Sequence, residues 1–236
     1  KGKEYKLKLP QFLCDYLIKD NVPPPFDRLV RGFRFVAITG NSGSGKTSLL
    51  VSLLLDKKIL KKTFNNVIVV CPPSSRKSMK RDPFEDLDPA KQFDTLEEID
   101  KIYEMLSFYS SEGETSLLVI DDNQSYLKDA HIANTLNHIC ANRRHLKTTI
   151  IVLLQTYNKL PLSSRKLLNV LIAFRPSKKE WVNIAEEALE CTPDQVDQIF
   201  KICFPHEDKD RHVWLMVDIQ HQKVWRQFDE ILLKED

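Results

Sequence analysis

The sequence predicts an α/β protein whose mostly parallel β-sheet is covered by helices on both faces. Five runs of consecutive apolar residues are separated by segments with helical spacing, and the last part of the chain alternates apolar and polar residues on both sides of a polar turn. Unbroken apolar runs are typical of strands buried on both faces, and their alternation with helices favours parallel pairing. The final alternation predicts a C-terminal β-hairpin.

Each element can be placed in chain order. Strands are expected at residues 33–39, 66–71, 117–120, 148–155, 169–174, 213–218 and 223–228, and helices at 46–55, 99–106, 131–141, 181–189 and 196–200. The stretch between Arg76 and Phe93 is charged and irregular. Capping boxes, which mark helix N-termini, are predicted for three pairs: Thr95 with Glu98, Ser177 with Glu180, and Thr192 with Gln195.

Length and composition favour one domain with a sizeable core in a chain of 236 residues. We expect that domain at residues 26–236, preceded at 1–25 by a basic arm and a linker that its three prolines hold extended. The formal net charge of +2 does not by itself indicate a nucleic-acid binder. The five cysteines form no C-x-x-C pair, and no apolar run approaches the roughly 20 residues of a membrane span. Neither a zinc site, a disulfide framework nor a membrane partner is therefore expected, and reduced, cytosol-like surroundings fit best.

The strongest motif is Gly-Asn-Ser-Gly-Ser-Gly-Lys-Thr at residues 40–47, which matches G-x-x-x-x-G-K-[ST] between an expected strand and an expected helix. Its glycines let backbone N–H groups turn inward around phosphates, and the helix N-terminus adds further N–H groups. Lys46 is expected to contact the β- and γ-phosphates of a nucleotide, and the Thr47 hydroxyl to bind Mg²⁺. The predicted nucleotide-binding residues are Gly40, Asn41, Ser42, Gly43, Ser44, Gly45, Lys46, Thr47 and Ser48.

Two carboxylates follow the expected strand at 117–120. Because ligands of parallel sheets bind at the carboxyl ends of strands, Asp121 and Asp122 are expected beside the phosphates. Asp121 would hold Mg²⁺ through its water shell, and Asp122 would orient or deprotonate the attacking water. Many hydrolytic P-loop motors carry Glu at the second position, so Gln124 or Glu112 is an alternative helper for the shorter Asp122.

Three further residues are candidates for catalysis. Gln155 ends the strand at 148–155 and is the predicted γ-phosphate sensor, since an amide can donate to the phosphate and accept from the water. Arg143 and Arg144 precede the other end of that strand. Either one of them acts as an arginine finger in a neighbouring subunit, or the pair caps the preceding helix.

The nucleotide is expected to be ATP. Asn158-Lys159-Leu160-Pro161 begins like the guanine-reading N-K-x-D motif but lacks its Asp, and no Gly follows Asp121-Asp122 in the manner of GTPases. GTP specificity is therefore disfavoured.

With these residues in place, the chain resembles the viral genome-packaging ATPases of the poxvirus and large-DNA-virus type, within the HerA/FtsK superfamily of P-loop motors. The resemblance rests on residues 40–47, the Asp121-Asp122 pair, the basic segment 142–146 before the strand ending at Gln155, and the hairpin at 213–228 that ends in Phe228-Asp229-Glu230. An Asp-Asp pair at this position and a sensor Gln are usual in that family.

The resemblance implies an additional-strand sheet, in which the strand ending at Gln155 lies between those of the P-loop and of Asp121. It also implies a homo-oligomeric ring, a pentamer or hexamer, that threads double-stranded DNA into a preformed capsid. Assembly sites in the cytoplasm of the infected host cell are the implied location, with the virion as a second one.

Three basic clusters are candidates for a sequence-independent DNA surface: Lys57-Lys58 with Lys61-Lys62, Arg76-Lys77 with Lys80-Arg81, and Arg165-Lys166. Ordinary solvated surface is the alternative for each. The second cluster is the favoured one because it follows a strand end and a proline break, and the lysines of residues 1–8 are candidates for docking a neighbour or a capsid protein.

The leading expectation is therefore a Mg²⁺-dependent ATPase that translocates viral double-stranded DNA. Two alternatives remain open at this point. One is a nucleotide or nucleoside kinase with residues 76–93 as its lid, and the other is an ATP-gated assembly protein with little turnover.

Overall fold

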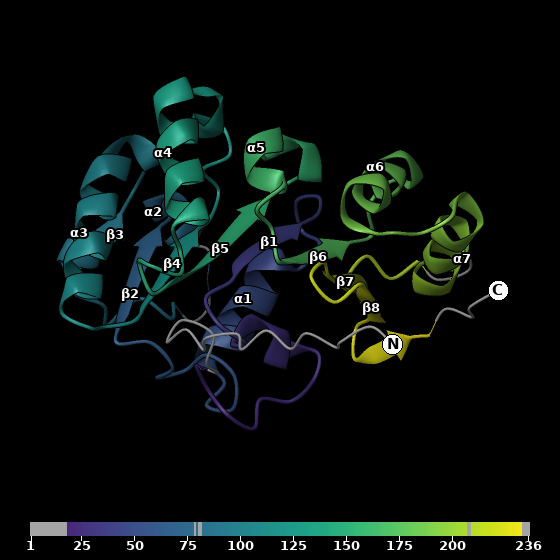
Figure 1. Ribbon diagram of the computed structural model, residues 1–236, viewed down its shortest axis with the longest axis horizontal. Coiled ribbons are helices and arrows are strands. Elements are labelled where there is room, and N and C mark those ends of the chain that lie inside the picture. The colour runs from purple at the N-terminus through teal and green to yellow at the C-terminus, as the bar shows by residue number, and fades with distance from the viewer. Residues whose placement is uncertain (1–17, 78, 80–81, 207–208, 233–236) are drawn as a thin grey trace, which may run out of the picture.

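The computed structural model describes residues 18–77, 79, 82–206 and 209–232, which form one nine-stranded sheet between two layers of helices (Figure 1). The strands are β1 (Phe35–Thr39), β2 (Asn66–Val70), β3 (Gln92–Phe93), β4 (Ser116–Ile120), β5 (Thr148–Leu154), β6 (Val170–Phe174), β7 (Trp214–Asp218), β8 (Lys223–Arg226) and β9 (Asp229–Ile231). The α-helices are α1 (Lys46–Leu55), α2 (Pro73–Lys77), α3 (Ile99–Ser111), α4 (Ala130–Ala141), α5 (Leu162–Arg165), α6 (Lys178–Ala188) and α7 (Pro193–Cys203). Short 3₁₀ helices are η2 (Phe26–Leu29), η3 (Pro89–Lys91), η4 (Leu96–Glu98), η5 (Tyr126–Lys128) and η6 (Tyr157–Lys159).

The sheet has the order β3-β2-β4-β5-β1-β6-β7-β8-β9. Pairing is parallel from β3 to β6 and antiparallel from β6 to β9. The predicted α/β class, the parallel sheet and the hairpin are confirmed, and β5 lies between β1 and β4 as the family resemblance implies. The hairpin continues the main sheet, and β9 adds a further strand that the sequence pattern does not predict.

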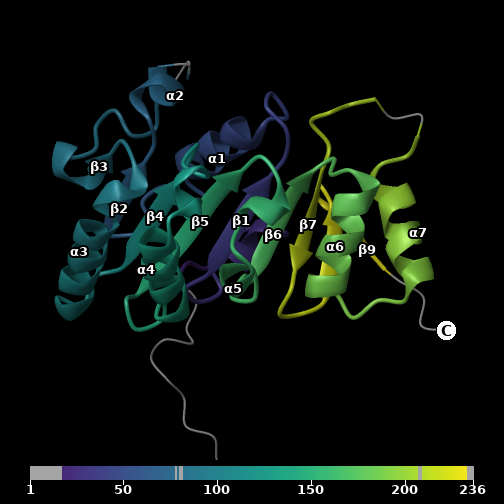
Figure 2. The ribbon, with the colours of Figure 1, turned by 90° about the horizontal axis from the view of Figure 1, so that it is seen from above.

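The two faces of the sheet pack against different helices. Helices α3, α4, α6 and α7 cover one face, while α1 and η2 lie on the other (Figures 1 and 2). Strands β1, β4, β5 and β6 are buried along their whole length, which explains why their sequences show no alternation. Strand β7 is also buried along its whole length, so the alternating burial expected for residues 213–218 is wrong.

The predicted capping boxes have three different outcomes. The box of Thr192 and Gln195 is present at the start of α7. At α6, Ser177 accepts from the backbone N–H of Glu180, but the Glu180 carboxylate accepts from the N–H of Tyr157, so only half of the box forms. The box of Thr95 is wrong: its hydroxyl caps the 3₁₀ helix η4, and α3 begins only afterwards.

The stretch expected to be irregular contains more structure than its composition suggests. Two residues separate helix α2 from the end of β2, and the short strand β3 pairs with the end of β2. Two residues give too little pattern to indicate a strand, and β3 exists because β2 offers it an open parallel edge.

The described end of the expected linker packs against the domain. The backbone N–H of Ile18 donates to the carbonyl of Val30 at 2.9 Å, and Val22 is buried. Lys19 donates through Nζ to the carbonyl of Lys57 at 2.6 Å. The predicted boundary between residues 25 and 26 stays a prediction.

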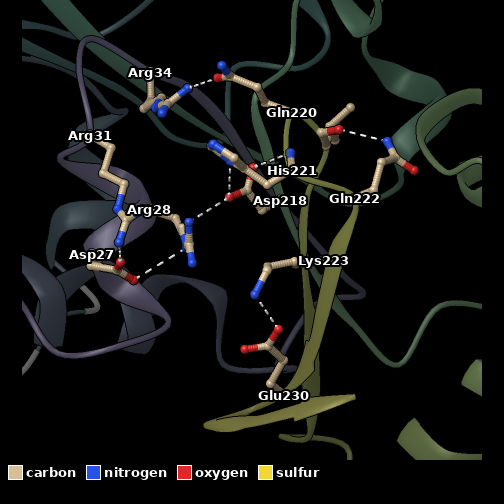
Figure 3. Close-up of polar contacts among 11 residues, drawn as sticks. Asp27, Arg28, Arg31, Arg34, Asp218, Gln220, His221, Gln222, Lys223 and Glu230 are labelled. Atoms are coloured by element: carbon tan, nitrogen blue, oxygen red, sulfur yellow. Dashed lines mark hydrogen bonds and ion pairs between the residues drawn. The ribbon is translucent and has the colours of Figure 1, made fainter. Parts of the chain in front are cut away.

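Polar contacts join the start of the described domain to the terminal hairpin (Figure 3). Arg28 of η2 lies 3.5 Å from the carboxylate of Asp218, the last residue of β7, and this carboxylate also accepts from Nδ1 of His221 at 2.8 Å. Arg34, just before β1, donates to the side chain of Gln220 in the hairpin turn. The start of the described domain and its terminal hairpin are thereby held side by side.

Within the part of the chain that the structure describes, no helix is long and apolar enough to cross a membrane, and no cluster of three His, Cys, Asp or Glu side chains could hold a metal ion. Cys71, Cys140, Cys191 and Cys203 are free thiols. Cys14 and the lysines of residues 1–8 lie outside the described residues.

Candidate nucleotide-binding site

The glycine-rich loop connects the end of β1 to the first turn of α1. Gly45 directly precedes α1 with φ +107°, a conformation that other residues rarely adopt. A Cβ atom at this position would also lie 3.2 Å from Nδ1 of His212 and 3.3 Å from Cε1 of Phe174. A glycine is therefore required both by the backbone angle and by the close approach of two side chains.

Lys46 is the first residue of α1, and its side chain folds back over the loop. Its Nζ donates to the carbonyls of Gly40 at 2.6 Å and Asn41 at 3.0 Å. Burial lowers the pKa of Lys46, while the neighbouring carboxylates Asp121 and Asp122 act in the opposite direction. The ammonium group is held above the loop in which phosphates would lie.

Thr47 and Asp121 provide neighbouring oxygen atoms at the floor of the site. The Thr47 hydroxyl donates to Oδ2 of Asp121 at 3.2 Å, and the backbone N–H of Asp121 donates to the carbonyl of Val70. Asp121 is only 7% exposed, and burial raises the pKa of its carboxyl, although the bond from Thr47 opposes the rise. A hydroxyl and a buried carboxylate suit Mg²⁺, which prefers oxygen ligands and would offset the buried charge.

Asp122 adopts the left-handed conformation with φ +53°, which Asp tolerates better than most residues. Its Oδ2 accepts from the hydroxyl of Ser75 in α2 at 2.9 Å. Asp121 and Asp122 therefore leave β4 in different directions, one toward Thr47 and the other toward Ser75. No local pattern in the sequence marks Ser75 as a partner of Asp122.

The end of β5 closes the site from the other side. The backbone N–H of Gln155 donates to Oε1 of Gln124 at 3.0 Å, so Gln124 links the loop after β4 to the loop after β5. Of the two alternative helpers for Asp122, Gln124 lines the site. Glu112 does not, because it ends α3 and precedes β4, which places it at the opposite end of the sheet; that alternative is wrong.

These side chains line one open pocket at the carboxyl ends of β1, β4 and β5. Of the predicted catalytic and metal-binding residues, the structure brings together Lys46, Thr47, Asp121, Asp122 and Gln155. The full lining is Ser42, Gly43, Lys46, Thr47, Ser75, Asp121, Asp122, Gln124, Leu153, Leu154 and Gln155.

Arg143 and Arg144 lie far from this pocket in the same chain, before the opposite end of β5. Arg143 donates through Nε to the carbonyl of Phe33 at 3.1 Å and through Nη1 to the carbonyl of Cys140 at 2.9 Å. It thus satisfies a carbonyl in the last turn of α4, in agreement with the capping alternative. Arg144 is exposed.

Two of the three candidate basic clusters, including the favoured one, are partly engaged within the chain. Arg76 forms an ion pair with Asp82 at 2.6 Å and also donates to Gln92. Arg165 pairs with Glu187 at 2.8 Å. These arginines stabilise the domain, which reduces their availability for phosphates; Lys80 and Arg81 lie outside the described residues.

A segment that sequence reading missed contacts the glycine-rich loop. His212 lies in the connection between α7 and β7, and its Nδ1 is 3.0 Å from the carbonyl of Ser44. Nη1 of Arg211 lies 4.0 Å from the place where a Cβ of Gly43 would be. Because 168 positions separate His212 from Ser44, no local pattern could have indicated the contact.

Residues 26–224 match the family model described as Poxvirus A32 protein. A comparison with curated proteins finds no match.

Several solved structures share the fold. One is the genome packaging NTPase B204 from Sulfolobus turreted icosahedral virus 2 in complex with AMPPCP, with a TM-score of 0.60 and 14% identity over 86% of this chain and 99% of that chain. Another is the cytoplasmic domain of the type VII secretion ATPase EccC from Thermomonospora curvata, with a TM-score of 0.51 and 18% identity over 78% of this chain and 24% of that chain. At such identities the likeness shows the fold alone.

Proposed function

This chain belongs to the poxvirus A32 protein family, and from that membership and the geometry of its pocket we propose that it is an ATPase that packages viral double-stranded DNA. The observation that carries the proposal is the convergence of Lys46, Asp121 and Gln155 on one pocket from three different strand ends. This set combines a phosphate-binding cation, a metal-binding carboxylate and an amide near the γ-phosphate position. A site for phosphate binding alone would not need the last of these.

Each residue has a distinct role in the proposed hydrolysis. The loop N–H groups and Lys46 bind the triphosphate, and Lys46 exchanges its bonds to the carbonyls of Gly40 and Asn41 for bonds to phosphate oxygens. Thr47 and Asp121 would hold Mg²⁺, whose charge would offset the negative charge on the phosphates in the transition state. Catalysis in such sites depends mainly on positioning and electrostatic stabilisation.

Asp122 and Gln155 are proposed to handle the attacking water. Asp122 accepts a proton from the water or orients it, and Ser75 holds the carboxylate in place through its 2.9 Å hydrogen bond. The Gln155 amide donates to the γ-phosphate and accepts from the same water. Gln124 fixes the backbone of Gln155 and so holds the loop after β4 and the loop after β5 together.

Assembly into a homo-oligomeric ring is part of the proposal. Arg143 is anchored to two backbone carbonyls, whereas Arg144 is exposed on the same edge, so we assign Arg144 as the residue that reaches a neighbour's γ-phosphate. The ring would hold double-stranded DNA through phosphate contacts without reading sequence. The exposed Lys57, Lys58 and Lys62 remain candidates for such contacts. Action in the infected cell and contact with capsid proteins follow from the proposed role.

The direct test is hydrolysis of ATP by the purified protein with Mg²⁺, with and without double-stranded DNA. We expect Mg²⁺-dependent phosphate release that DNA stimulates. Lys46→Ala should abolish turnover, while Lys179→Ala, which removes an exposed lysine from α6, should retain it.

Three results would contradict the proposal. Full turnover by Lys46→Ala would remove the site assignment. Transfer of phosphate to a nucleoside instead of water would indicate a kinase. Tight ATP binding without turnover, even at high protein concentration with DNA, would indicate an ATP-gated assembly protein.

A further inference from the structure

We propose that Arg211 and His212, which lie just before β7, form a second part of the nucleotide site, in which Arg211 supplies a cation to the polyphosphate and His212 positions the glycine-rich loop. The inference rests on the proposed function in that it assumes a nucleoside triphosphate as ligand. It adds a contribution from a part of the chain that lies outside the P-loop, Asp121-Asp122 and Gln155.

The contact of His212 with the loop is direct. Its Nδ1 is 3.0 Å from the carbonyl of Ser44, within hydrogen-bond distance. The same atom would be only 3.2 Å from a Cβ at Gly45. His212 therefore packs on the residue that begins the turn into α1, where small shifts change the direction of the N–H groups that face the phosphates.

Arg211 brings a positive charge to the same loop. Its Nη1 lies 4.0 Å from the Cβ position of Gly43, and Gly43 lines the pocket. The side chain is exposed, and no carboxylate of the described residues forms an ion pair with it. An arginine beside a phosphate-binding loop can make charge-assisted, bidentate bonds to phosphate oxygens.

Arg211 approaches the glycine-rich loop from a different side than the proposed catalytic side chains after β4 and β5 do. Asp121, Asp122 and Gln155 follow β4 and β5, on one side of β1 in the sheet. Arg211 and His212 come from the segment that leads into β7, on the other side of β1, and this segment lies at the same end of the sheet as the start of α1 (Figure 2). A triphosphate whose γ-phosphate faces Asp121 extends across the loop toward this second side.

Arg175 holds the connecting segment in place. It follows β6, and its Nη1 and Nη2 each lie 3.4 Å from a carbonyl of the segment, those of Asp210 and Pro205. The carboxylate of Asp210 in turn accepts from the backbone N–H of His212 at 2.8 Å. These bonds hold Pro205 and Asp210 against the end of β6, and they thereby fix the position of Arg211 and His212 beside the loop.

Equilibrium binding measures the proposal without requiring turnover. Affinities for inorganic tripolyphosphate and for a non-hydrolysable ATP analogue would be compared, with Mg²⁺, among wild type, Arg211→Ala, Arg211→Lys and Lys209→Ala. Lys209→Ala is the matched control because it removes one exposed cation from the same segment. We expect Arg211→Ala to weaken both affinities by about ten- to hundredfold, the loss of one charge-assisted bond, with partial recovery in Arg211→Lys and less than a twofold change in Lys209→Ala.

His212 is tested by a graded pair of variants. His212→Ala should weaken the affinity for the ATP analogue by about three- to tenfold, as for one neutral hydrogen bond, and His212→Asn should lose less because an amide can still donate to Ser44. The melting temperature of the ligand-free protein should change little for Arg211→Ala, since that side chain is exposed. This separates a binding role from a structural one.

The outcomes distinguish this inference from the proposed function. Equal affinities for Arg211→Ala and wild type, or an equal loss in Lys209→Ala, would overturn the role of Arg211. Unchanged binding by His212→Ala would overturn the role of His212. If wild type binds tripolyphosphate but never hydrolyses ATP, the proposed ATPase function is wrong, while the roles of Arg211 and His212 can still be measured by binding. If wild type binds neither ligand, the proposed function and these roles are both wrong.

Discussion

At the level of single residues, the pocket lowers the stability of the ligand-free fold because it buries charged side chains. Asp121 is 7% exposed, and its hydrogen bond from Thr47 does not compensate for the loss of water, since the pKa of its carboxyl is raised. Lys46 shows the complementary effect, with a pKa lowered by burial. A pocket that binds phosphates and Mg²⁺, as proposed, would have to hold these groups in place before either ligand arrives, and the buried charges destabilise the ligand-free fold.

Asp121→Asn should therefore stabilise the ligand-free protein while it abolishes Mg²⁺-dependent hydrolysis. The amide keeps an acceptor for Thr47 but carries no charge, so we expect a gain at pH 7 of roughly 0.5–2 kcal/mol in the free energy of unfolding, the usual range for a stabilising substitution. Urea denaturation of both proteins measures the difference. A loss of stability at neutral pH would contradict this account of Asp121.

The pH dependence of that gain has a definite sign. Because the pKa of Asp121 is raised in the folded state, the folded protein binds this proton more tightly than the unfolded chain. Below its ordinary pKa of 3.8 the carboxyl does not destabilise the folded state. The destabilisation grows as the pH rises from there through the folded-state pKa. The stability difference between Asp121→Asn and wild type should thus be small in acid and reach a plateau at higher pH.

At the level of elements, the N-termini of α6 and α7 show which features the local sequence determines and which depend on tertiary contacts. Thr192 and Gln195 form the complete box that their spacing predicts. In α6, by contrast, Glu180 accepts from Tyr157 of η6, so a contact made by the fold replaces the local one. The same motif therefore predicts the helix start in both cases but the side-chain partner in only one.

Thr192→Ala should destabilise the domain by about 1 kcal/mol, because α7 loses the acceptor for the backbone N–H of Gln195. Thr192→Ser keeps the hydroxyl and is the matched control, with most of the stability retained. Thermal or urea unfolding of the three proteins provides the measurement. Equal losses for both variants would mean that packing of the Thr methyl group matters more than the cap.

At the level of the whole molecule, contacts between distant segments join the two ends of the described domain. The Asp218 carboxylate is 3% exposed and lies between Arg28 and His221, and Arg28 also stacks over the ring of Trp225 at 5.4 Å (Figure 3). The contacts of Arg28 with Asp218 and Trp225 thereby attach η2 to the hairpin. These contacts lie outside the candidate pocket, and their role is to complete the fold around it.

Asp218→Asn should destabilise the domain by about 3 kcal/mol, since it removes the buried carboxylate that pairs with both Arg28 and His221 and leaves Arg28 with Asp27 as its only carboxylate partner among the described residues. Glu230→Gln is the control, because its ion pair with Lys223 is more exposed and should contribute no more than about 1 kcal/mol. Urea unfolding would compare the two. Equal effects would show that burial does not decide the strength of these pairs.

The proposed ring makes a prediction about mixed assemblies. Arg144→Ala subunits should lower the activity of wild-type assemblies by more than their fraction, because each would disable a neighbour's site. Arg143→Ala should mainly lower stability, since Arg143 bonds the carbonyls of Phe33 and Cys140 within its own chain. ATPase titrations with increasing variant fraction distinguish the two. A strictly proportional fall for Arg144→Ala would count against a role in the neighbouring site.

Much of the fold could be predicted because its signals are local. The buried strands are marked by unbroken apolar runs, and the loop at residues 40–47 by residue types that only a phosphate-binding turn requires together. The polar ends of β4 and β5 indicated Asp121, Asp122 and Gln155, because parallel strands end at one edge. The strand β3 was missed, since its two residues depend on an edge that β2 provides.

Local patterns are enough to predict the strand and helix types, the glycine-rich loop and the polar residues that follow the strands, because each depends on neighbours within a few positions. The tertiary structure alone decided that Ser75 holds Asp122, that Arg143 is anchored to backbone carbonyls, and that His212 contacts Ser44 across 168 positions. Such contacts depend on how separate elements pack, and no short pattern encodes their relative placement. The glycine-rich loop therefore predicts a phosphate site from local pattern, whereas the packing of distant segments determines which other side chains lie around that loop.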